Sequence, residues 1–151
     1  MDRREFAGMM PGLLALGVLG GVEAEGQAAT TGKELKELSS GVFKAGPEKK
    51  GSQAKHVSRA FGSGLLKAGN IRLEMHESMQ DAGAEHEPVG THLHNEIWFV
   101  QKGTASLFIN GTEHTMEAGD VGLVCAGDKH WIKNVGDGEL SYFVLAVGPP
   151  E

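Results

Sequence analysis

The chain has 151 residues, enough for one domain with a hydrophobic core and too few for two ordinary domains. Its formal net charge is −6, with acidic and basic residues interspersed, so it offers neither a basic stripe for nucleic acid nor a polybasic patch for an anionic membrane. The single cysteine excludes an internal disulfide. We therefore expect one domain, without nucleic-acid partners, that is stabilised by its core.

The first 28 residues have the organisation of a signal peptide. Adjacent Arg3 and Arg4 precede a mainly apolar run from residue 6 to residue 22, and small residues follow it. The run contains Pro11 and several glycines and is shorter than the roughly 20 residues that a bilayer span needs. We expect it to be cleaved, which leaves no stable membrane span. The alternative is an apolar anchor that is kept.

The "DRREF" segment near the start resembles a twin-arginine export signal, in which paired arginines precede a phenylalanine and a mildly hydrophobic region. This resemblance implies that the protein is exported in a folded state to the bacterial periplasm or beyond. Cleavage after Ala28 fits the small residues at that point, with Ala24 and Ala29 as alternatives.

Residues 29–59 are predicted to form a linker or an N-terminal arm. They are rich in lysine and glutamate and are interrupted by several glycines and a proline, and only "KELKELSS" favours a short helical turn. The few apolar residues of this segment could lie against the outside of the domain or against a partner subunit. They are Leu35, Leu38, Val42 and Phe43.

Residues 60–151 are predicted to form an all-β domain, because apolar and polar residues alternate over short runs. Asn110 and Gly111 tolerate the positive φ angles of a two-residue hairpin and mark the clearest turn. A buried strand is expected from Val121 to Cys125, where the cysteine would serve as a small apolar filler. About eight short strands without intervening helices favour an antiparallel β-sandwich or a small barrel.

A row of metal-ligand types lies in the segment "GTHLHNEIWFVQKG". His92, His94 and Glu96 occur at every second position, so in an extended strand their side chains would share one face. Imidazole nitrogens and carboxylate oxygens are ligands for Fe, Mn, Ni, Cu and Zn. A fourth ligand is expected from elsewhere in the chain, and His130, after a glycine-rich turn, is the best candidate.

Residues 83–134 resemble the two motifs of the cupin superfamily. Glu96 and Gly103 match the end of the first motif, and the stretch from Gly119 through Gly127 and His130 to Asn134 matches the second. The resemblance implies a jelly-roll barrel that holds one divalent transition metal between His92, His94, Glu96 and His130. It also allows a homodimer.

Two positions depart from the family pattern. The spacing from Glu96 places the first expected histidine at Gly90 and the second at His92, so one usual ligand is missing and His94 is additional. Either His94 replaces the missing ligand or the site is weakened. His86 is a further candidate for the vacant position, although a solvated loop histidine is the simpler interpretation. The second departure is Cys125, which stands where the family usually has proline. Its thiol could bind a nearby metal, although a small apolar filler is the simpler interpretation.

Two functions follow as hypotheses. The first is an exported metal-binding cupin whose metal holds a small oxygen-bearing molecule, with dioxygenase or isomerase activity. The residues identify no separate catalytic acid or base. The second is a non-catalytic module that binds a small molecule or a metal, which the vacancy at Gly90 favours. His76 and His114, in alternating strands, are interpreted as structural.

Overall fold

The computed structural model describes residues 35–150 of the chain, and all regular elements in this range are β-strands. No helix in the described range is long and apolar enough to cross a membrane. The predicted signal peptide lies outside the described residues. The strands are β1 (Lys49–Lys50), β2 (His56–Leu66), β3 (Ile71–Gln80), β4 (Asn95–Lys102), β5 (Thr104–Ile109), β6 (Thr112–Glu117), β7 (Val121–Val124), β8 (His130–Asn134) and β9 (Leu140–Gly148).

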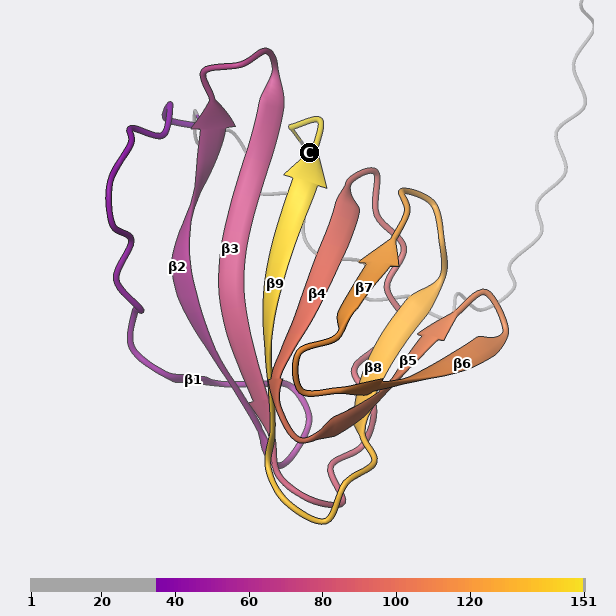
Figure 1. The fold of residues 1–151 in the computed structure, drawn as a ribbon. Coiled ribbons are helices and arrows are strands. Elements are labelled where there is room, and N and C mark those ends of the chain that lie inside the picture. Colours follow the sequence, from indigo (N-terminus) through magenta and orange to yellow (C-terminus); the bar gives the residue numbers. More distant parts are fainter. Residues whose placement is uncertain (1–34, 151) are drawn as a thin grey trace, which may run out of the picture. The chain divides into compact units, whose positions relative to one another are not determined.

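The strands form two antiparallel sheets that face each other (Figure 1). The larger sheet has the order β1-β2-β3-β9-β4-β7, and the smaller one has the order β6-β5-β8. The last strand, β9, lies between β3 and β4, so the pairing in the centre of the large sheet joins distant parts of the chain. The predicted all-β antiparallel sandwich is confirmed.

The space between the sheets is filled by alternate residues of each strand. In β4 the side chains of Glu96, Trp98 and Val100 point inward and are buried, whereas Ile97 and Phe99 between them are exposed. Both sheets contribute to one apolar cluster. Its buried members are Trp98, Val100, Ala105, Leu107, Met116, Val124, Ile132, Leu140, Tyr142 and Val144.

The hairpin between β5 and β6 turns at the predicted residues. Asn110 has φ +48° and Gly111 has φ +98°, and Ile109 pairs with Thr112 across the turn. Positive φ at both central residues is what a two-residue hairpin requires, and asparagine and glycine are the residues that best tolerate it. The prediction of this hairpin is confirmed.

The N-terminal arm lies against the outside of the domain as an extended chain. Leu38 N–H donates to the Leu65 carbonyl over 2.8 Å, and Leu65 N–H donates to the Lys36 carbonyl over 2.9 Å. The prediction of a helical turn around residue 36 is therefore wrong, because the Lys36 carbonyl and the Leu38 N–H bond to β2 instead of closing a turn. Strand β2 also begins at His56, before the expected start of the domain at residue 60.

Strand β7 differs from the buried strand that its composition predicts. Val121 and Leu123 are exposed and only Val124 is buried, because β7 is the edge of the large sheet and turns one face outward. Cys125 follows the strand and is also exposed, so its expected role as a buried filler is wrong.

Candidate metal centre

The first group of candidate ligands lies where the chain enters β4. Glu96 is the second residue of that strand, whereas His92 and His94 precede it, with a bend at residues 93–94. The expectation that all three residues lie in one continuous extended strand is therefore wrong. The bend nevertheless leaves the three side chains together, because their ligand atoms all lie within 4.8 Å of one another.

The fourth candidate, His130, is the first residue of β8 in the opposite sheet. The turn that precedes it is attached to the first group, since Gly127 N–H donates to the His92 carbonyl over 2.8 Å. Gly90 and His130 also exchange both of their backbone hydrogen bonds, at 2.8 and 3.1 Å. These bonds hold the two motif regions side by side and direct His130 into the barrel.

Three imidazoles converge on the carboxylate of Glu96. His130 Nε2 lies 2.9 Å from Glu96 Oε2, and His94 Nε2 and His92 Nε2 lie 3.4 and 3.9 Å from Glu96 Oε1. The rings of His92 and His94 stack with centroids 4.6 Å apart. Glu96 and His130 are buried, and the other two histidines are partly buried. The structure thus groups His92, His94 and Glu96, and it places the His130 ring against the carboxylate of that group.

The contact between His130 and Glu96 has the spacing of two metal ligands. Glu96 Oε2 is buried and has no hydrogen-bond partner among the described residues, so its 2.9 Å approach to His130 Nε2 lacks hydrogen-bond geometry. Two atoms bound to one ion at about 2.1 Å lie about 3.0 Å apart at right angles and about 3.4 Å apart in a tetrahedron. The 2.9 Å between His130 Nε2 and Glu96 Oε2 therefore fits a shared ion, while His94 Nε2 is hydrogen-bonded to the other oxygen, Glu96 Oε1, over 3.4 Å.

The orientation of the His130 ring supports the same interpretation. Its Nδ1 atom lies 3.0 Å from the Asp128 carbonyl oxygen, which can only accept, so Nδ1 carries the proton and Nε2 is left to face Glu96. A metal-binding histidine characteristically donates its second ring N–H to such an acceptor. The donor set and its support thus fit a divalent transition metal.

Charges within the cluster shift two pKa values. Burial alone would raise the pKa of Glu96, but the neighbouring His130, His92 and His94 lower it, and the lowering prevails. Burial alone would lower the pKa of His130, but Glu96 and the Asp128 carbonyl raise it, and here the raising prevails. The carboxylate and the imidazolium therefore stabilise each other in the metal-free protein.

Gly90, the vacant ligand position, borders the cluster directly. A Cβ atom at this position would lie 2.8 Å from His130 Nε2 and 2.9 Å from His92 Nε2, so the two imidazoles use the space of the missing side chain. His86 does not fill this position. Its ring is exposed and stacks on Trp131, and its Nδ1 lies 2.5 Å from the Glu87 carbonyl oxygen.

Sequence reasoning missed a partly buried carboxyl close to this cluster. Glu87 Oε1 accepts a 2.5 Å hydrogen bond from the hydroxyl of Tyr142, which stands 55 residues later in the chain. His56 Nε2 lies 3.2 Å from the same oxygen. No spacing in the sequence links these residues, so only the folded structure reveals the contact.

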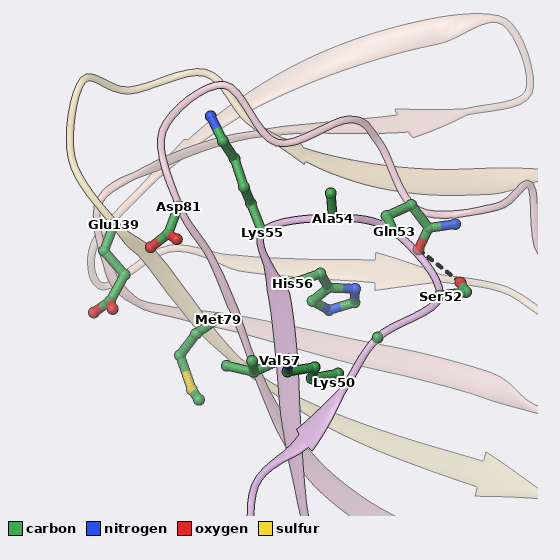
Figure 2. A pocket seen from close by; sticks show the side chains of 11 residues that line it. Lys50, Ser52, Gln53, Ala54, Lys55, His56, Val57, Met79, Asp81 and Glu139 are labelled. Atoms are coloured by element: carbon green, nitrogen blue, oxygen red, sulfur yellow. Dashed lines mark hydrogen bonds between the residues drawn. The ribbon is translucent and has the colours of Figure 1, made fainter.

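The described residues also form a cavity of about 470 Å³ that is separate from the ligand cluster (Figure 2). It is lined by residues 50–57, Met79, Asp81 and Glu139, and none of the four candidate ligands reaches it. His56, the first residue of β2, is among the lining residues. Because lysines and acidic residues both line this cavity, it has no single charge preference.

The sequence of residues 76–147 matches the family described as "Cupin domain". This range begins in β3, ends in β9 and contains all four candidate ligands. No curated protein matches the chain significantly.

Several solved structures share the fold at low sequence identity. KdgF from Halomonas sp. has a TM-score of 0.58 at 13% identity, with 75% of this chain and 96% of that one covered. An RmlC-like cupin from Shewanella frigidimarina has a TM-score of 0.54 at 16% identity, with 72% of this chain and 86% of that one covered. A predicted oxalate decarboxylase from Thermotoga maritima has a TM-score of 0.53 at 18% identity, with 70% of this chain and 92% of that one covered. Residues 76–147 thus match the cupin domain family, and the fold is shared with solved cupin structures.

Proposed function

We propose that this protein binds one divalent transition metal, of the series Fe, Mn, Ni, Cu and Zn, through His92, His94, Glu96 and His130. The observation that carries the proposal is the approach of His130 Nε2 to the buried Oε2 of Glu96, at 2.9 Å and without hydrogen-bond geometry. A buried polar atom left without a partner is costly unless a ligand satisfies it. A shared cation satisfies both atoms at once.

We further propose that the bound metal holds a small oxygen-bearing molecule. When bound, the ion would supply Lewis-acid or oxygen-activating chemistry. The chain itself contributes a donor, because Trp98 Nε1 is buried and has no hydrogen-bond partner among residues 35–150. Trp98 also meets His130 edge to face at 6.0 Å, which places this indole beside the ligand cluster. An oxygen atom of the small molecule is a suitable acceptor for it.

The reaction class is proposed as dioxygenase or isomerase, since both suit a metal that binds an oxygen-bearing substrate. One structural neighbour is described as a predicted oxalate decarboxylase, which supports a small oxygen-rich ligand. Because a shared fold does not fix chemistry, the substrate must be found by assay.

The second candidate is a binding module without catalysis. It is favoured by Gly90, which leaves a usual ligand position of the family without a donor atom. Turnover of small oxygen-bearing substrates by the metal-loaded protein would support the enzyme, whereas stoichiometric binding without turnover would support the module.

The metal proposal is tested by elemental analysis of the purified full chain after exposure to each metal. We expect about one equivalent in the wild type and loss of it in His130→Ala. His114→Ala is the matched control, because His114 is exposed on β6, away from the cluster. Equal metal content in wild type and His130→Ala would overturn the proposed ligand set.

Export is a separate part of the proposal and is supported by the twin-arginine-like segment and the apolar run that follows it. Mass spectrometry of the protein from its native envelope should show loss of about 28 residues. An intact Met1 would contradict the proposed cleavage.

A homodimer is also proposed, through the outer face of β4 and β7. Ile97 pairs with Leu123 and Phe99 pairs with Val121, and all four side chains are exposed. An exposed apolar patch of this kind is typical of an interface. Sedimentation of the wild type and of Leu123→Glu distinguishes a dimer through this face, which the charge would disrupt, from a monomer.

A further inference from the structure

A chain of hydrogen bonds inside the barrel ends on Glu87. Asn134 N–H donates to Gln80 Oε1 over 2.8 Å, Gln80 Nε2 donates to the Tyr142 hydroxyl over 3.1 Å, and that hydroxyl donates to Glu87 Oε1 over 2.5 Å. Gln80, Tyr142 and Asn134 are all buried. The chain is therefore shielded from water along most of its length.

The direction of these bonds is fixed by the first donor. A backbone N–H can only donate, so Gln80 must present its oxygen to Asn134 and its NH₂ group to Tyr142. The Tyr142 hydroxyl then accepts from Gln80 and has its single hydrogen left for Glu87. Glu87 Oε1 is consequently an acceptor, which makes Oε2 the better site for a proton bound by this carboxyl.

The backbone of Glu87 is bonded to β8, the strand that also carries His130. Its N–H donates to the Ile132 carbonyl over 3.0 Å, and Gly90 bonds in both directions to His130, so residues 87–90 run along β8. Ile132 and His130 are two residues apart on this strand, which corresponds to about 6.6 Å. The carboxyl thus belongs to the same interior as the proposed metal site without being one of its ligands.

The surroundings of Glu87 favour its protonated form. Burial raises its pKa to about 7, against the lowering effect of the Tyr142 hydrogen bond, while the charge of Glu96 raises it and that of His130 lowers it. His56, on β2, does not supply a compensating charge, because burial and the nearby His76 lower its own pKa. A carboxyl that titrates near neutral pH can both take up and release a proton there.

We propose that Glu87 is an acid–base group of the barrel interior, which exchanges a proton through Oε2 with the small molecule held at the ligand cluster. This inference rests on the proposed function. When Oε2 acts as a base, the bond between hydrogen and the bound molecule breaks, its electron pair stays on that molecule, and an O–H bond forms on Glu87. The reverse step returns the proton, so no oxidant or reductant is required. Tyr142 and Gln80 are positioning residues.

The test measures the protons released when Zn²⁺ binds to the metal-free full chain at pH 7. Calorimetric titrations in buffers of different ionisation enthalpy give this number. The positive charge of the bound ion lowers the pKa of Glu87, so the wild type should release up to about half a proton more than Glu87→Gln. Glu85→Gln is the matched control, because Glu85 is exposed two residues earlier, and it should behave as the wild type.

Tyr142→Phe separates a proton-exchanging role from a structural one. This variant lacks the O–H that stabilises the ionised carboxylate, so the pKa of Glu87 should rise and more protons should be released than in the wild type. The two variants are thus expected to differ from the wild type in opposite directions. Urea unfolding at pH 7 confirms that each variant is folded before it is titrated.

The measurement separates the proton-exchanging role of Glu87 from the proposed metal site. Binding of one Zn²⁺ with equal proton release in the wild type and Glu87→Gln overturns the role of Glu87 and leaves the metal site intact. Absence of Zn²⁺ binding in the wild type overturns the proposed function, and the inference with it.

Discussion

His130 Nε2 on β8 lies 2.9 Å from Glu96 Oε2 on β4, although these strands belong to different sheets. The contact joins the two motif regions across the interior of the barrel. Its two residues are buried, and the backbone bonds between Gly90 and His130 keep it in place. The pair therefore links the ionisation of these two residues to the folding of the domain, and it lies at the proposed metal site.

Removal of the carboxylate should abolish tight metal binding. Glu96→Gln keeps the size of the side chain but loses the negative charge toward which three imidazoles converge. Loss of a supporting group near a metal typically costs 10- to 100-fold in affinity, so we expect at least about a 100-fold loss for this central ligand. Competition titration against a chelator of known affinity measures it, with Glu85→Gln as the control. An unchanged affinity would show that Glu96 is not a ligand.

A methyl group at the vacant ligand position should also weaken metal binding. In Gly90→Ala the new Cβ would lie 2.8 Å from His130 Nε2 and 2.9 Å from His92 Nε2, so both imidazoles must move. We expect a loss of about 10-fold or more in metal affinity in the same titration. Gly138→Ala is the control, because its Cβ would meet no atom within 4 Å. Equal losses in both variants would contradict a specific role of position 90.

The stability of the metal-free protein should depend on pH through the same pair. The raised pKa of His130 stabilises the fold below its unfolded value of about 6.5, and this is lost as the pH rises through the folded value. The lowered pKa of Glu96 stabilises it above about 4.5, and this is lost as the pH falls through the folded value. Both contributions are thus complete between about pH 4.5 and 6.5.

Urea unfolding of the metal-free wild type and Glu96→Gln at pH 5.5 and pH 8.5 checks this window. The variant should lose more stability, relative to the wild type, at the lower pH, because the imidazolium of His130 is then present without its carboxylate. Groups that titrate equally in both proteins cancel in the difference. A difference independent of pH would contradict the electrostatic coupling.

The core and the edge of the large sheet should differ sharply in their response to truncation. Leu107 is 1% exposed within the core cluster, so Leu107→Ala should reduce the free energy of unfolding by about 2–5 kcal/mol. Leu123 is 58% exposed on β7, and Leu123→Ala should change it by less than about 0.5 kcal/mol. Urea unfolding at concentrations below any self-association measures both. Similar costs would contradict the exposure of β7.

Local patterns in the sequence were enough to determine the strands, one turn and part of the site. Alternation of apolar and polar residues predicts which side chains of β4 face inward, since successive residues of a strand point to opposite faces. The Asn110-Gly111 hairpin follows from the backbone freedom of two adjacent residues. The grouping of His92, His94 and Glu96 follows from short spacing along the chain, and it persists even though a bend replaces the expected strand.

Only the tertiary structure decided which distant residues meet. Glu87 precedes β4 and bonds to β8, yet its Oε1 lies 2.5 Å from the hydroxyl of Tyr142 on β9, and no local pattern encodes a contact over 55 residues. Position in a sheet likewise decided that β7 is exposed, because an apolar run has the same composition at an edge as at the centre. Side-chain periodicity is a local property, whereas strand order, burial and the pKa values that depend on them result from the packing of the whole domain.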